Sequence, residues 1–178
     1  FVITVLISLP LFGVNFSRTK GIFSTSLSQV KNPFIALMGA LVMVNLMLVG
    51  GEHSMVKIIG RTFAEVTGSD WTIFSSFLGA VGAFFSGSNT VSNLTFGSVQ
   101  LSTAETTGLS VTLILALQSV GGAMGNMVCI NNIVAVSSVL NIQNQEGTII
   151  KTTIIPMVIY GIIAALCATL LIPLLYTL

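Results

Sequence analysis

The chain has 178 residues, of which 53% are hydrophobic and 6% are charged, and its formal net charge is +1. A soluble domain carries about 25% charged residues, so this chain has too few charges to cover a surface that faces water. The composition therefore indicates a membrane protein. It excludes a nucleic-acid-binding protein, because no cluster of Lys and Arg is present to neutralise phosphates.

Side chains that bind metals or react as nucleophiles are sparse. Cys129 and Cys167 lie far apart among apolar residues, a spacing that predicts neither a zinc site nor a disulfide framework. His53 has no neighbouring His or Cys, so we expect no metal site and no cofactor. A membrane-bound enzyme would need a ligand set or a nucleophile with its base, and neither pattern is present. We therefore expect a protein that is not an enzyme.

The chain begins inside an apolar run, without the basic segment or the small-residue cleavage site of a signal peptide. We interpret residues 1–14 as a truncated membrane helix, and we expect the chain to be a fragment whose missing N-terminal part completes the functional unit. Residues 15–32 are polar. Pro33 suits the first turn of a helix, and residues 33–50 are apolar enough to predict a spanning helix.

Residues 53–67 alternate charged and apolar side chains at helical spacing, which predicts an amphipathic helix in the membrane interface. Trp71 follows where an aromatic belt residue would lie. Two ionisable features nearby have two interpretations each. The Glu52–His53 pair is either a pH sensor or a solvated pair, and Glu105 is either a proton carrier or a solvated loop acid.

Residues 71–103 predict a re-entrant hairpin. The segment is uncharged and long enough to span a bilayer, yet its centre is rich in Gly, Ser, Thr and Asn and too polar for contact with lipid. Unwound backbone at membrane depth is tolerated only against protein or a water-filled cavity. We therefore expect two apolar arms with a tip at residues 87–90.

Residues 107–140 predict a broken spanning helix, with the break at the Gly-rich residues 121–126. A polar loop over 141–151 and a terminal spanning helix over 152–176 follow. The loops over 15–32 and 141–151 together carry four Lys and Arg, against two over 52–70. This count places the first two loops in the cytoplasm of a multi-pass inner or plasma membrane protein, so that the hairpin enters from outside.

The two polar breaks together predict a binding site for a small anion, because secondary transporters place their substrates on discontinuous helices near the bilayer midplane. The free N–H groups and the dipole of a half-helix attract a carboxylate, and freed carbonyl oxygens can hold a cation or a protonated water. No Lys or Arg lies within 71–140, so uncharged donors would hold the anion. The candidate substrate- or ion-binding residues are Gly87, Ser88, Asn89, Thr90, Asn93, Gly121, Gly122, Gly125 and Asn126.

A structural interpretation accounts for part of the same pattern. Glycines spaced as Gly121 and Gly125 are often present only to let two membrane helices pack closely. Asn45, alone in its helix, is expected to make an interhelical hydrogen bond. Gln118 lies next to the second break and could serve either packing or binding.

The stretch GAFFSGSNTVSNLTFG, residues 82–97, resembles the bacterial L-lactate permease family, and so does the stretch QSVGGAMGNMVCINN, residues 118–132. Their order and the closing helix resemble the C-terminal end of that family, and the resemblance covers most of the chain. It implies proton-coupled uptake of lactate, and often of glycolate, across the bacterial cell membrane. Some lactate permeases carry a lysine where this chain has Asn126, so direct charge pairing with a carboxylate is not implied at that position.

The triplet Ser88-Asn89-Thr90 is also similar to the hairpin-tip signature of sodium-coupled dicarboxylate carriers, which implies that these three residues lie at the substrate or ion site. The expected fold is thus an all-α polytopic membrane protein, one half of an inverted-repeat transporter. Its partners would be a small carboxylate, a proton or sodium ion, the lipid bilayer and the missing N-terminal part, with no nucleic acid. The alternative function is a sodium-coupled carrier of di- or hydroxy-carboxylates.

Overall fold

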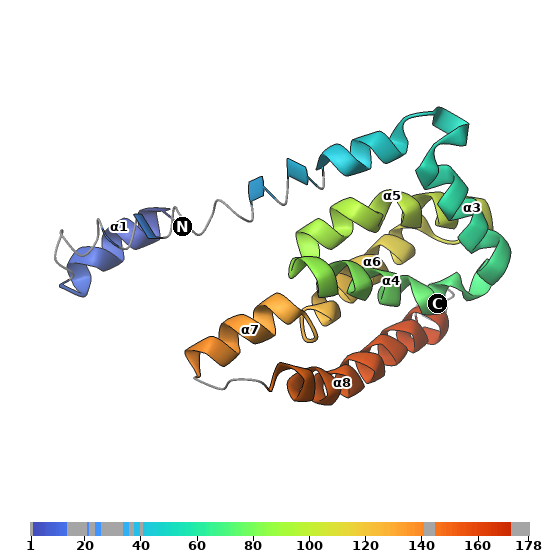
Figure 1. Ribbon diagram of the computed structural model, residues 1–178. Coiled ribbons are helices and arrows are strands. Elements are labelled where there is room, and N and C mark those ends of the chain that lie inside the picture. The colour runs from blue at the N-terminus through green and yellow to red at the C-terminus, as the bar shows by residue number, and fades with distance from the viewer. Residues whose placement is uncertain are drawn as a thin grey trace. The chain divides into compact units, whose positions relative to one another are not determined.

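The structure is a computed structural model that describes residues 2–13, 21, 24, 25, 34, 35, 38, 39, 41–140 and 145–171. Every regular element in these residues is helical (Figure 1). The chain divides into two units, Phe1–Gly39 and Ala40–Leu178. In the first unit, α1 (Val2–Leu11) lies within the helix expected over 1–14. Most of the loop expected over 15–32 and part of the helix expected over 33–50 lie outside the described residues, whereas residues 41–48 are helical.

In the second unit, α3 (Met55–Thr67) packs one face of small residues on α5 (Asn89–Thr107). Ser54 caps the helix by accepting a hydrogen bond from the Lys57 N–H at 3.4 Å. Gly60 brings α3 close to α5, since a Cβ at this position would lie 2.6 Å from Ser102 Oγ. The opposite face exposes large apolar side chains, including Met55 and Ile58, and its place in the membrane interface stays a prediction.

Trp71 differs from the expectation of an aromatic belt residue, because its side chain is only 3% exposed. The ring stacks on Phe63 with 4.8 Å between ring centroids. The indole Nε1–H donates to Gln100 Oε1 at 2.8 Å, so burial leaves the indole with a hydrogen-bond partner. The physical reason for the difference is this buried acceptor on α5, two turns before the end of the helix.

Helices α4 (Trp71–Ser86) and α5 run antiparallel as a helical hairpin (Figure 1). The contacts show this antiparallel arrangement, because Ser75 of α4 meets Gln100 of α5, whereas the later residue Gly79 of α4 meets the earlier residue Ser92 of α5. Between the helices, Gly87 has the left-handed backbone φ of 68° that ends α4, and its N–H donates to Ala83 O at 2.8 Å. The hairpin thus turns within the tip expected from the sequence, and its re-entrant course stays a prediction.

Helix α6 (Val111–Gly125) is followed by a short turn and then by α7 (Ile130–Val139). The interruption therefore lies at residues 126–129, at the far end of the expected break over 121–126. The helix continues through Gly121 and Gly125 because both lie against the backbone of α4, where a Cβ would collide with the carbonyl oxygens of Ser76 and Ala80. Backbone N–H groups of the turn donate to carbonyls three residues earlier, which keeps the interrupted backbone hydrogen-bonded.

Helix α8 (Glu146–Leu166) continues as a π-helical segment, η3 (Cys167–Leu171). It begins six residues before the terminal helix expected over 152–176, inside the expected polar loop, and Glu146 lies in the first turn where the helix dipole favours an acid. Residues 172–176 of the expected helix lie outside the described residues. Two helical stretches, Val111–Ser137 and Glu146–Leu170, are long and apolar enough to cross a membrane.

Candidate functional site

The hairpin tip lies against the turn between α6 and α7, so the structure brings the two predicted breaks together. A Cβ at Gly87 would lie 3.1 Å from Cys129 Sγ and 3.5 Å from Asn132 Oδ1. Cys129 is fully buried beneath this contact. Only glycine combines the left-handed φ at residue 87 with so close an approach to the neighbouring turn.

Asn89 is the first residue of α5 and the closest link between the tip and α6. Its side-chain oxygen Oδ1 lies against Gly122, where a Cβ would collide with it. This oxygen is buried and has no hydrogen-bond partner among the described residues. The Asn89 and Gly122 pair therefore joins one candidate from each break, and a buried amide oxygen faces the junction without a donor.

Ser88 and Thr90 occupy different surroundings at the same tip. Ser88 is the N-cap of α5, and its Oγ accepts a hydrogen bond from the Val91 N–H at 3.3 Å. Its own N–H donates to Ser86 Oγ at 3.2 Å, so Ser88 shapes the turn. Thr90 is exposed. The first two N–H groups of α5, those of Asn89 and Thr90, have no partner within the described part of the chain and are free to donate to an anion.

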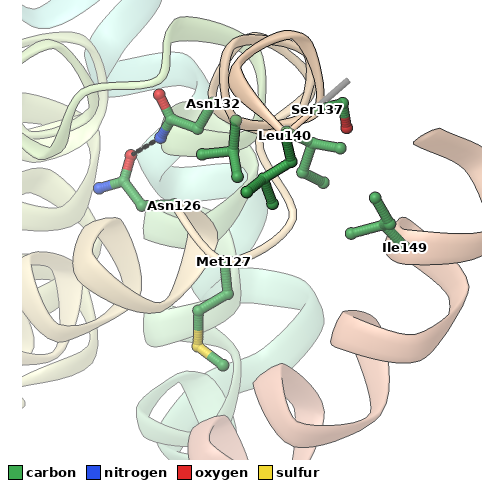
Figure 2. A pocket seen from close by; sticks show the side chains of 8 residues that line it. Asn126, Met127, Asn132, Ser137, Leu140 and Ile149 are labelled. Carbon is green, nitrogen blue, oxygen red and sulfur yellow. Dashed lines mark hydrogen bonds between the residues drawn. The ribbon is translucent and has the colours of Figure 1, made fainter. Parts of the chain in front are cut away.

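Asn126 and Asn132 face each other across the turn between α6 and α7 (Figure 2). Asn132 Nδ2 donates to Asn126 Oδ1 at 3.3 Å, and Asn126 Nδ2 donates to Gly122 O at 3.2 Å. The two amides border an open hollow of about 230 Å³ whose other walls are mostly apolar and come from α7 and the start of α8. Its lining residues are Asn126, Met127, Asn132, Ile133, Val136, Ser137, Leu140 and Ile149.

Asn93 lies one helical turn after Asn89 on α5 and contacts α6 instead of the tip. Its Nδ2 donates to Ser119 Oγ at 3.4 Å, and Gln118 Nε2 approaches its Oδ1 at 3.5 Å. Gln118 is 1% exposed, and its Nε2 also donates to Ser92 Oγ at 3.0 Å. Residues 89 and 93 of α5 thus face Gly122 and Ser119 of α6 along one seam.

Gly121 and Gly125 lie on another face of α6, against α4. Their positions on the Ser76 and Ala80 carbonyls support the packing interpretation of these two glycines. Among the nine candidates, the structure therefore groups Gly87, Asn89, Gly122 and Asn126 at one junction, with Ser88 and Thr90 on the hairpin side of it and Asn93 one turn away.

Sequence reasoning missed the residues that support this junction from within the bundle. Ser92 and Gln100 are fully buried on α5, and both make hydrogen bonds to α4 or α6. Cys129, for which the sequence predicted neither a zinc site nor a disulfide, lies directly under the tip. One signal could have identified Gln100, since a long uncharged amide in an otherwise apolar arm needs buried partners.

Charge is absent from the junction. Apart from the Cys129 thiol, the titratable residues nearest to it in the chain are Glu105 of α5 and Glu146 of α8, and α4, α6 and α7 carry no charged side chain. Glu105 lies in the last turns of α5 and pairs with Lys57 Nζ at 3.1 Å, and both side chains are partly exposed. Any anion at the junction would thus be held by backbone N–H groups and amide or hydroxyl donors.

Comparison with known proteins matches residues 1–175 to the model of the L-lactate permease family. The chain is 82% identical over its 178 residues to a Haemophilus influenzae protein named "Putative L-lactate permease", of which it covers 34%. It is 28% identical over 152 residues to the glycolate permease GlcA of Escherichia coli K12 and 31% identical over 133 residues to the L-lactate permease of Bacillus subtilis.

The chain spans about a third of the length of the Haemophilus influenzae relative, 26% of the glycolate permease and 23% of the Bacillus subtilis protein. No solved structure matches it. The relatives carry the names of lactate and glycolate permeases, so the sodium-coupled dicarboxylate alternative is not favoured. Because the family model covers nearly the whole chain, the chain belongs to the L-lactate permease family, a family of transport proteins.

Proposed function

We propose that the chain is part of a secondary carrier that takes up L-lactate and related small 2-hydroxy monocarboxylates, such as glycolate, across the cell membrane by coupling to protons. The family match supports the substrate class, and the helical spans support a multi-pass protein of the inner or plasma membrane. In the complete carrier, the chain would be one half of an inverted repeat, and the other part of the same protein would complete the site.

One observation carries the location of the site, namely the junction of the hairpin tip with the turn after α6. There Gly87, Asn89, Gly122 and Asn126 meet without a charged side chain, and two free N–H groups open α5. A carboxylate would bind these N–H groups and the amide N–H groups of the asparagines, favoured by the positive end of the α5 dipole, and the unpaired Asn89 Oδ1 would accept from the substrate hydroxyl group. A small apolar group such as the lactate methyl would fit the mainly aliphatic walls beside Asn126 and Asn132.

Alternating access would follow from movement of the tip against the turn. In the re-entrant arrangement, the hairpin enters from outside and closes on α6 and α7. A substrate between the two elements would be covered when they meet and released when they part. A proton would travel with the anion, which removes the cost of moving a net charge through an uncharged site.

Uptake of radiolabelled L-lactate by cells that produce the full-length protein tests this function. We expect uptake that a proton uncoupler abolishes, that sodium does not stimulate, and that unlabelled glycolate inhibits. Cells producing an unrelated membrane protein at the same level serve as the control. Sodium-dependent uptake would refute proton coupling, and the lack of any lactate or glycolate uptake would refute the substrate class.

A further inference from the structure

A series of buried, hydrogen-bonded side-chain amides runs through the helical bundle beneath the proposed site. Gln100 of α5 is 0% exposed and Gln118 of α6 is 1% exposed. Gln100 Nε2 donates to Gln118 Oε1 at 2.8 Å. Gln118 Nε2 then donates to Ser92 Oγ at 3.0 Å and approaches Asn93 Oδ1 at 3.5 Å. This series of hydrogen-bonded amides therefore connects the inside of the bundle to Asn93 on the seam.

The oxygen and the nitrogen of the Gln100 side-chain amide are both fixed by neighbours that can act only as a donor or only as an acceptor. Trp71 Nε1–H, which is a donor only, binds Gln100 Oε1 at 2.8 Å. The backbone oxygen of Ser75, which is an acceptor only, accepts from Gln100 Nε2 at 2.8 Å. Reversing the Gln100 amide would set two donors together and two acceptors together, so its orientation is determined.

That orientation passes to the next residues in order. Because Gln100 directs an N–H at Gln118, Gln118 must present its oxygen there and its own N–H group to Ser92 and Asn93. Gln118 Nε2 has Ser92 Oγ, Ser92 O at 3.3 Å and Asn93 Oδ1 at 3.5 Å within reach. It therefore favours the orientation in which Asn93 presents Oδ1 to Gln118 and its Nδ2 donates to Ser119 Oγ at 3.4 Å. The donors of Trp71, Gln100 and Gln118 follow one another from α4 toward the seam, while Gln100 Nε2 and Ser92 Oγ also donate back to carbonyl oxygens of α4, and cooperative networks of this kind hold one arrangement.

Asn93 and Ser119 are both half-buried on the seam, one turn from the contact between Asn89 and Gly122. An amide N–H at this position attracts a carboxylate, whereas an amide oxygen would repel it. We propose that Gln118 is a positioning residue that turns the Asn93 amide so that its N–H group borders the carboxylate site. This inference rests on the proposed function, and Gln118 itself does not contact the substrate.

Two substitutions at residue 118 separate this role from packing. Gln118→Met keeps the volume and removes the hydrogen bonds, so either orientation of Asn93 becomes possible. Gln118→Glu keeps the shape, and while protonated its O–H donates as the amide did. When it ionises, it can only accept, and Asn93 must turn its N–H group inward. Burial raises the pKa of a carboxyl group, so we expect this ionisation well above the ordinary range of Glu.

The surroundings of residue 118 contain few groups that would confuse a pH measurement. Helices α4 and α6 carry no titratable side chain, and α5 carries Glu105, which pairs with Lys57 of α3. On α8 and η3, Tyr160 and Cys167 lie beside Leu117 and Val120.

Two control variants match the two changes. Gln145→Glu adds an acid at an exposed site, and Thr103→Val removes a buried hydroxyl that bonds only within its own helix.

The experiment measures lactate exchange by the full-length protein in lipid vesicles with equal pH on both sides, which removes the proton gradient. We expect Gln118→Met to raise KM about tenfold at every pH, with the maximal rate per molecule within about twofold of wild type. For Gln118→Glu, KM divided by the wild-type value should be near one at about pH 6 and rise about tenfold by about pH 8.5. Both controls should keep the wild-type KM at every pH.

Three results would overturn the inference in different ways. Lower maximal rates with unchanged KM in both variants would make Gln118 a packing residue only. A KM ratio for Gln118→Glu that does not change with pH would refute the transmitted orientation. Wild-type vesicles that exchange no carboxylate would refute the proposed function and this role with it. In that case the melting temperature of Gln118→Glu, compared with wild type as pH rises, still tests whether the order of hydrogen bonds exists.

Discussion

At the scale of single residues, the glycines of this chain divide into those that allow contact between helices and those that do not. Gly121 and Gly125 lie on the backbone of α4, and Gly122 lies under the Asn89 side chain. Gly97, in the middle of α5, has no other atom within 4 Å of the position of a Cβ. The sequence alone could not separate these glycines, because which face of α6 meets α4 depends on the packing of the whole bundle.

This difference gives a matched prediction. Gly121→Ala should lower the free energy of unfolding by about 1–3 kcal/mol, because its methyl group overlaps the Ser76 carbonyl and α4 must shift. Gly97→Ala should be neutral or stabilising by up to about 1 kcal/mol, since it removes a flexible residue from a helix. Thermal unfolding of the purified full-length protein in detergent measures both. Equal melting temperatures for the two variants would contradict the close packing of α4 and α6.

Glu105 provides a second prediction at this scale, because it separates a proton carrier from a surface acid. It pairs with Lys57 in a half-exposed setting, where an ion pair contributes about 0–1 kcal/mol. We expect Glu105→Gln to retain proton-coupled lactate uptake and to change the unfolding free energy by less than about 1 kcal/mol. Uptake that persists in the variant without responding to the uncoupler would instead identify Glu105 as the proton carrier.

At the scale of elements, the sequence predicted both interruptions, because Gly-rich and amide-rich runs inside apolar segments are not compatible with lipid contact. The hairpin turns where it was expected, whereas the second interruption lies at residues 126–129 and α8 begins at Glu146. The first shift goes with tertiary contacts, since Gly121 and Gly125 of α6 pack against the backbone of α4, whereas the early start of α8 places Glu146 in its first turn. The buried position of Trp71 likewise depends on Gln100, which lies 29 residues further along the chain.

The contact of the tip with the turn after α6 is testable with two glycines of the same conformation. Gly87 and Gly108 both end a helix with left-handed φ, of 68° and 71°. An alanine at either position costs about 1 kcal/mol in backbone strain, but only the one at 87 meets Cys129 Sγ, at 3.1 Å. We expect Gly87→Ala to be the more destabilising of the two.

Combining Gly87→Ala with Cys129→Ala should restore part of the lost stability, because the smaller side chain makes room for the new methyl group. The same Cys129→Ala change combined with Gly108→Ala should restore nothing, since a Cβ at Gly108 has no atom within 4 Å. Melting temperatures of the three single and two double variants measure the coupling. Additive effects in both pairs would mean that the tip does not rest on the turn.

At the scale of the whole molecule, the proposed function makes this chain the source of one uncharged junction in a larger carrier. Low charge, two candidate spans and the family match together indicate a membrane setting, and the proposed class of substrate rests on the family match. The sequence predicted the residues of the junction but not the amides that support it, because a buried Gln becomes visible only when its partners on other helices are known. The chain covers 34% of its Haemophilus influenzae relative.

Lactate uptake by full-length Asn89→Ala, compared with Asn45→Ala at equal membrane expression, tests the central claim most directly. Asn45 is exposed, and its Nδ2 donates to Leu41 O within its own helix, at 2.8 Å, instead of making the interhelical hydrogen bond expected from the sequence. If the junction of the tip with the turn binds the carboxylate, Asn89→Ala should lower uptake at least about tenfold, and Asn45→Ala should leave it unchanged. Normal, uncoupler-sensitive uptake by Asn89→Ala would keep the carrier but contradict the placement of its site at the hairpin tip.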